Sequence, residues 1–112
     1  MNINNLLVSS SGIEASKNFN GPIASHTAWL SDKYNLGPYM SETWRESNKK
    51  EIEDQDLVIF MEPLHYNYCT EHLHCNIPRY KIWNIPDVAG NSPNSEAENV
   101  FMMIRERVEG LI

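Results

Sequence analysis

The chain has 112 residues, enough for one domain and too few for two. Apolar residues make up 41%, which is ordinary for a globular protein, and the formal net charge is −6. Because an acidic surface repels phosphate groups, this charge argues against a nucleic-acid partner. No apolar run reaches the ~18–20 residues that a membrane-spanning helix needs, so we expect no membrane role.

The first third of the chain predicts one strand and one helix. Leu6 to Ser10 is typical of a short strand that ends at the turn signal Ser11-Gly12. Pro22 suits the first turn of a helix, where the N–H that proline lacks would have no partner. Residues at helical spacing define the face that we expect to be buried: Ile23, Thr27, Leu30 and Tyr34. The segment 35–38, with Gly37 and Pro38, ends this helix.

The middle of the chain alternates between helix and strand. Ser47 is a predicted N-cap for a short polar helix through Asp54. Residues 56–61 contain a continuous apolar run, which indicates a strand buried on both faces, as in a parallel sheet. Glu62-Pro63 opens a further helix that extends to about Cys69, and residues 80–83 form the next predicted strand.

The last segment has the clearest helical pattern. Ser95 and Glu98 have capping-box spacing. Apolar residues then recur on one helix face: Ala97, Phe101, Ile104, Val108 and Leu111. The order of strands and helices predicts a single α/β domain over residues 1–112, with three layers, a parallel sheet and right-handed crossovers.

Five segments, taken in order, resemble the low-molecular-weight protein tyrosine phosphatases. They are residues 8–15, the helix 22–34 with its exit 35–37, the strand 56–62, the segment Trp83 to Asp87, and the C-terminal helix ending at 108–111. The resemblance implies a flavodoxin-like parallel sheet, hydrolysis of phosphotyrosine monoesters and no cofactor. It also implies that Asp87 stands at the general-acid position, although Val88 and Ala89 replace the Pro and Tyr that usually follow it.

The family's Cys-x5-Arg phosphate loop has no counterpart in the sequence. Six residues after Cys69 stands Cys75, and six residues after Cys75 stands Lys81. Such a loop holds the oxyanion with backbone N–H groups and supplies a thiolate nucleophile. We therefore expect an N-terminally truncated member of the family, without its first strand, which is inactive alone.

The missing first strand has a consequence for assembly. The family's sheet order is 2-1-3-4, so the strands expected at 6–10 and 56–61 would lack the strand that lies between them. We expect a homo-oligomer or a split partner to fill this position, and phosphotyrosine proteins or small phosphomonoesters as ligands only if a complementary loop is supplied. The alternative is a pseudoenzyme that serves as a non-catalytic interaction module. Without a signal peptide, we expect a cytoplasmic protein with reduced thiols.

Two further sets of residues are candidates for a site. Tyr39 and Trp44 lie where the resemblance implies an aromatic wall for the substrate, and core packing is the alternative. Five potential metal ligands fall within eleven positions: His65, Cys69, His72, His74 and Cys75. Their order matches no common zinc spacing, so a surface helix with partly buried thiols is the competing interpretation. A third interpretation is that Cys69 and Cys75 form a redox pair.

Overall fold

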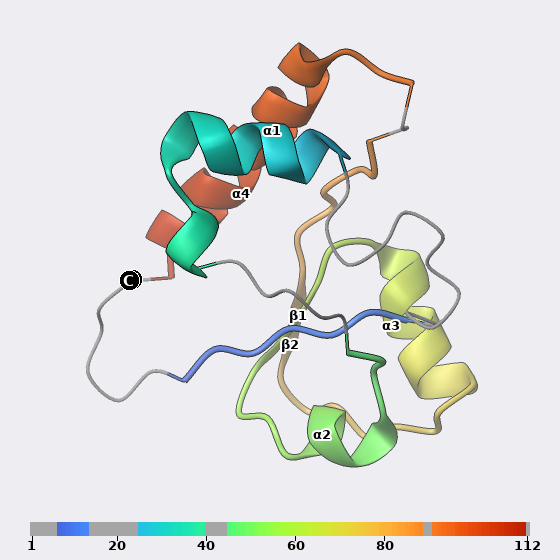
Figure 1. Cartoon of the computed structure of the whole chain (residues 1–112). Coiled ribbons are helices and arrows are strands. Elements are labelled where there is room, and N and C mark those ends of the chain that lie inside the picture. Colours follow the sequence, from blue (N-terminus) through green and yellow to red (C-terminus); the bar gives the residue numbers. More distant parts are fainter. Residues whose placement is uncertain (1–6, 14–24, 40–44, 89–90, 112) are drawn as a thin grey trace.

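A computed structural model describes residues 7–13, 25–39, 45–88 and 91–111. This part of the chain is a mixed α/β structure with four α-helices, one short 3-10 helix and a two-stranded parallel sheet (Figure 1). The elements in chain order are α1 (Ser25–Tyr34), η2 (Gly37–Tyr39), α2 (Lys49–Glu53), β1 (Val58–Phe60), α3 (Pro63–Glu71), β2 (Tyr80–Ile82) and α4 (Asn94–Glu109). The predicted α/β class is therefore confirmed.

Strands β1 and β2 are parallel and are joined through α3, which makes a βαβ unit. Val58 pairs with Tyr80, and Phe60 pairs with Ile82. The pairing continues past the strands, because the Trp83 amide donates to the Phe60 carbonyl at 2.9 Å. The predicted parallel relationship of these two segments is confirmed.

The core of this unit lies between the sheet, α2 and α3. Its buried members are Ile52 from α2, Phe60 from β1, and the two cysteines Cys69 and Cys75. The Tyr66 and Tyr80 rings stack beside Phe60 and extend the apolar contacts to the surface. The continuous apolar run at 56–61 thus supplies the strand that this core needs, with Phe60 at its centre.

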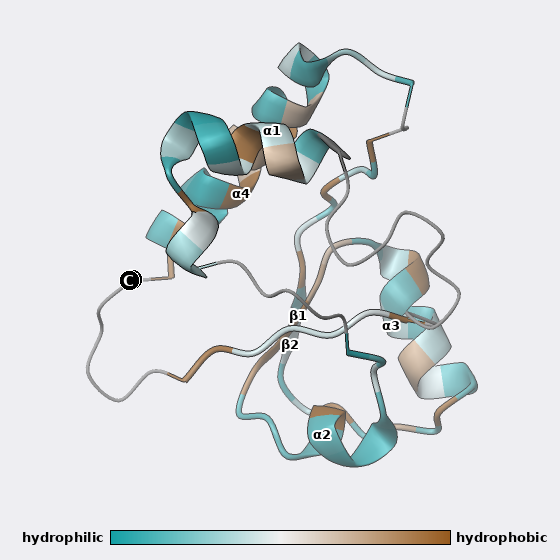
Figure 2. Ribbon diagram, viewed as in Figure 1, coloured by the Kyte–Doolittle hydropathy of each residue, from teal (hydrophilic) through white to brown (hydrophobic). Residues whose placement is uncertain are grey.

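Helices α1 and α4 form a second packing unit (Figure 1). Leu30 and Ala97 are buried, and the Tyr34 ring stacks on Phe101 with 4.9 Å between centroids. Apolar segments of both helices lie where the helices meet (Figure 2). The predicted apolar face of α4 is largely confirmed, because its side chains at positions 97, 101, 104 and 108 are buried or half-buried.

The exit of α1 follows the predicted stop signal. Asn35 adopts a left-handed conformation with φ of 56°, and the Leu36 amide donates to the Ser31 carbonyl at 2.9 Å. This geometry is a Schellman-type helix end with asparagine in the position that glycine usually fills. Within α1, Thr27 is exposed, so the prediction that it lies on the buried face is wrong. Ile23, on the same predicted face, is outside the described residues.

The strand predicted at 6–10 is wrong for the part that the structure describes. Residues 7–10 are irregular, and the side chains of Leu7 and Val8 are 96% and 79% exposed. Gly12, two residues after this segment, forms a single parallel bridge with Glu46. A short apolar segment forms a strand only when another strand accepts its hydrogen bonds, and residues 7–10 pair with no strand in the described structure.

Two predicted helix caps are also wrong. Helix α2 is capped by Asn48, whose side chain accepts from the Glu51 amide at 3.0 Å. Ser47 instead shares a hydrogen bond of 2.7 Å with the Ser11 hydroxyl. Helix α4 begins at Asn94, so its N-cap is Pro93, which has no side-chain acceptor, and Ser95 lies inside the first turn. Glu98 pairs with α1 instead.

Candidate functional site

The two cysteines point into the core. They are the only cysteines in the chain, and their side chains are 1% exposed for Cys69 and 8% exposed for Cys75. Burial, with a smaller contribution from Cys75, raises the pKa of the Cys69 thiol to about 11. Burial also raises the pKa of Cys75, and nearby Glu53 adds to the shift. Both side chains are therefore neutral thiols near neutral pH, which suits core packing and opposes nucleophilic attack.

The three histidines of the same segment do not join the thiols. His65 is half-buried on α3, with its Nε2 4.0 Å from a carboxylate oxygen of Glu62. His72 is exposed and stacks on the Tyr68 ring, and His74 is exposed with a left-handed φ of 55°. Among the described residues, no three His, Cys, Asp or Glu side chains gather to hold a metal ion.

The turn that follows α3 places the cysteines and the two later histidines on opposite sides. The Cys75 amide donates to the Cys69 carbonyl at 3.0 Å, which brings Cys75 back under α3 while His72 and His74 stay outside. The clustering of the five residues in sequence does not become a cluster of ligands in the described structure. Metal binding by this segment stays a prediction.

The residues placed by the family resemblance lie apart from the core thiols. Asp87 is exposed in the segment between β2 and α4, and in the described structure its carboxylate has no hydrogen-bond or ion-pair partner. Tyr39 ends η2 with 82% of its side chain exposed. Trp44, the second candidate for the aromatic wall, is outside the described residues. The roles proposed for these three residues stay predictions.

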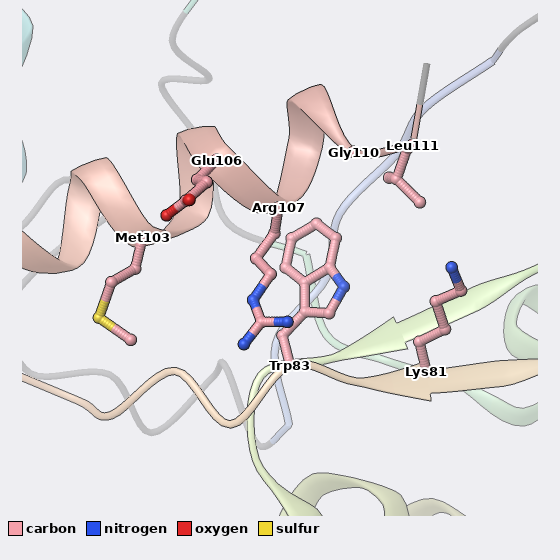
Figure 3. Close-up of a pocket in the computed structure, with 7 residues that line it drawn as sticks. All are labelled: Lys81, Trp83, Met103, Glu106, Arg107, Gly110 and Leu111. Carbon is pink, nitrogen blue, oxygen red and sulfur yellow. The ribbon is translucent and has the colours of Figure 1, made fainter.

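A cleft of about 550 Å³ lies between β2 and the C-terminal half of α4 (Figure 3). Its lining residues come from two segments of the chain: Lys81 and Trp83 from the strand side, and Met103, Glu106, Arg107, Gly110 and Leu111 from the helix side. Lys81 and Trp83 are two residues apart and so project from the same face of an extended strand. Met103, Glu106 and Arg107 are spaced three and four positions apart, so they lie on one face of α4, and Gly110 and Leu111 follow directly after the helix.

Trp83 forms the apolar centre of this cleft. Its side chain is only 8% exposed, and its backbone amide is held by the Phe60 carbonyl. The next residue, Asn84, has a left-handed φ of 56°, and the Ile85 amide then donates to the Met61 carbonyl at 2.7 Å. This turn fixes the chain on both sides of Trp83, so the indole has a defined orientation toward α4 (Figure 3).

Two cations stand on either side of the indole. In Figure 3 the Arg107 guanidinium lies beside the Trp83 ring, and the Lys81 ammonium lies beyond it. In the part of the chain that the structure describes, neither cation forms an ion pair. Glu106 is the one acidic residue of the lining, and its carboxylate lies at the Met103 end of the cleft. The cleft therefore combines an apolar surface with an excess of positive charge.

Sequence reasoning did not find this cleft. Lys81 and Arg107 are separated by 26 positions and belong to no motif. Two patterns in the sequence bear on it: Lys81 and Trp83 fall on one face of a strand, and Met103 and Arg107 fall on one face of a helix. These patterns indicate a shared cleft only when it is known that this helix lies opposite this strand.

Within the described residues, no helix combines the length and the apolar character that a bilayer crossing demands. Comparisons with protein-family models, with curated proteins and with solved structures gave no significant match.

Proposed function

We propose that this chain is a low-molecular-weight tyrosine phosphatase-like module that does not hydrolyse phosphomonoesters by itself and that binds a second polypeptide. The order of its elements supports this proposal, with a helix before β1, α3 between β1 and β2, and α4 last. The parallel pairing of β1 and β2 is what the resemblance expects of its third and fourth strands. In this proposal the domain has a three-layer, flavodoxin-like fold.

The state of the thiols carries the catalytic half of the proposal. A cysteine phosphatase attacks phosphorus with a thiolate, which needs a lowered pKa and access to substrate. Cys69 and Cys75 have neither, since both are buried and both have a raised pKa. Asp87 could protonate a leaving group only after a nucleophile has attacked. Without a thiolate, its exposed carboxylate has no reaction to serve.

The binding half of the proposal rests on the N-terminal described segment and on β1. Leu7 and Val8 are apolar and exposed, and β1 pairs on one side with β2. Exposed apolar residues favour association with a partner, and a strand that pairs on one side within the described structure can accept another strand on its other side. The partner is either a second copy of the chain or a polypeptide that supplies a strand, a Cys-x5-Arg loop and a helix.

The first experiment combines light scattering with hydrolysis of p-nitrophenyl phosphate on one purified sample. We expect a mass of two chains or more and no turnover. Turnover that disappears in Cys69→Ser or Cys75→Ser would overturn the catalytic half. A monomer at all concentrations would exclude self-association and leave the split partner as the form to test.

The second experiment supplies a phosphate loop as a separate peptide. A peptide with the first strand, phosphate loop and helix of a low-molecular-weight tyrosine phosphatase is mixed with this chain, and the same peptide with its loop cysteine changed to serine is the control. We expect turnover when the chain is mixed with the unmodified peptide and none with the serine control. Asp87→Asn in the chain should reduce that turnover about 10²–10⁴-fold. A folded complex without turnover, or turnover that is insensitive to Asp87→Asn, would contradict the phosphatase-like assignment.

A further inference from the structure

We infer that the cleft between β2 and α4 is a binding site for a small organic anion with an apolar body. This inference is independent of the proposed function, because it uses neither the cysteines nor Asp87. It rests on the shape of the cleft, on the buried indole of Trp83, and on the two cations beside that indole.

The size of the cleft fits a small ligand, and its lining combines apolar and charged side chains. Small-molecule sites typically enclose about 300–1,000 Å³. This cleft has a volume of about 550 Å³ and presents Trp83, Met103 and Leu111 as its apolar surface. Met103 and Leu111 are both more than one-third exposed, so a ligand that enters the cleft removes their side chains from water.

The charges of the cleft select the sign of the ligand. Lys81 on the strand and Arg107 on the helix both face the space around Trp83, whereas Glu106 lies at the other end (Figure 3). Arg107 also suits the last turn of α4, where a cation balances the partial negative charge of a helix end. The helix end does not explain the position of Lys81, because Lys81 lies on β2, on the opposite side of the cleft. Together the two cations favour a ligand that carries negative charge.

The arrangement predicts a defined pose. An aromatic or aliphatic body lies against the indole and Met103, and a sulfonate or carboxylate group reaches toward Lys81 and Arg107. Arginine and lysine differ here, because the planar guanidinium can donate two parallel hydrogen bonds to such a group whereas the ammonium acts as a point charge. A ligand with only the apolar body would lack contacts with the cations, and a ligand with only the anionic group would lack contacts with the apolar surface.

The test follows the Trp83 indole N–H by two-dimensional NMR during titration with three probes. They are naphthalene-1-sulfonate, 1-naphthol, which has the ring without the charge, and inorganic sulfate, which has the charge without the ring. The Trp83 signal is assigned by its loss in Trp83→Phe. If that variant does not fold, the losses in Trp29→Phe and Trp44→Phe assign it by elimination. We expect a saturable shift with naphthalene-1-sulfonate and binding about tenfold weaker or more with the other two probes.

Three variants that each remove one positive charge complete the experiment. Lys81→Gln and Arg107→Gln should each weaken binding of the sulfonate about 3–10-fold. Arg105→Gln is the matched control, because Arg105 lies on the same helix, pairs with Glu109 at 3.3 Å and does not line the cleft. Thermal unfolding checks that each variant folds. Equal binding of sulfonate and naphthol, equal effects of all three variants, or no shift at Trp83 would each overturn the inference.

Discussion

The Tyr34 hydroxyl on α1 donates a hydrogen bond of 3.0 Å to the Glu98 carboxylate on α4, across 64 positions of sequence. Lys33 donates to the same carboxylate oxygen. This contact joins the first and last helices of the described structure, next to the stacked rings of Tyr34 and Phe101.

The contact predicts an acid-sensitive contribution to stability. The hydrogen bond from Lys33, followed by that from Tyr34, lowers the pKa of Glu98. A carboxylate with a lowered folded-state pKa stabilises the fold above its unfolded pKa, and this stabilisation is lost as pH falls through the folded pKa. We expect Glu98→Gln to unfold at a lower temperature than the wild type at about pH 6, and the difference to shrink by about pH 3.

Glu96→Gln is the control for this experiment. Glu96 is exposed in the first turn of the same helix and has no ion pair among the described residues, so its substitution should have a much smaller effect. Thermal unfolding followed by circular dichroism at several pH values gives the comparison. The same pH-dependent difference in both variants would show that the contact with α1 is not responsible.

The helix end at Asn35 predicts opposite effects for two small residues. Glycine adopts a φ of 56° without steric cost, whereas alanine is strained there. We expect Asn35→Gly to change stability by less than about 0.5 kcal/mol or to raise it, and Asn35→Ala to lower it by about 1 kcal/mol. Urea unfolding measures both values. Equal stability of the two variants would mean that the backbone does not hold this conformation in solution.

The buried thiols predict slow chemical modification. With a pKa of about 11, roughly one Cys69 side chain in a thousand is a thiolate at pH 8, and burial restricts access further. We expect Ellman's reagent to react with Cys75 before Cys69 in the native protein, and with both at once in denaturant. Cys69→Ala and Cys75→Ala assign the two phases. A fast-reacting Cys69 would reveal an open core and would weaken the argument against a cysteine nucleophile.

The packing of α1 on α4 predicts a penalty for a larger side chain at position 97. Ala97 is buried, so Ala97→Leu should force the surrounding structure to shift and lower stability by about 1–3 kcal/mol. Ala28→Leu is the same change at an exposed position of α1 and should stay within about 0.5 kcal/mol of the wild type. Similar losses in both variants would contradict this assignment of the buried face.

Much of the fold could be predicted because its signals are local. The apolar run around Phe60, Pro63 at a helix start, and the apolar face of the last helix each depend on neighbours within a few positions. The failures have a different origin. Glu98 had capping-box spacing with Ser95, but its carboxylate found Lys33 and Tyr34 more than sixty positions away. A pattern of neighbouring residues cannot show that such distant side chains compete for the same carboxylate.

The candidate site was less predictable than the fold. The segment from His65 to Cys75 drew attention because its residue types are chemically reactive, yet the structure turns its cysteines inward and leaves His72 and His74 outside. The cleft depends on ordinary residues such as Lys81 and Arg107, which become significant only because the fold places the end of α4 opposite β2. The residue types indicated which chemical reactions were conceivable, whereas the three-dimensional arrangement determined which side chains can contact the same ligand.

The connectivity of the two packing units sets an order on synthesis. Residues 49–85 contain α2, β1, α3 and β2, so this unit can pack once its own continuous stretch of chain has left the ribosome. Helix α1 is made before this unit, and its partner α4 follows it in the chain. Leu30 and Tyr34 therefore stay uncovered while residues 35–93 are synthesised, and chaperones that recognise exposed apolar side chains can bind α1 during that interval.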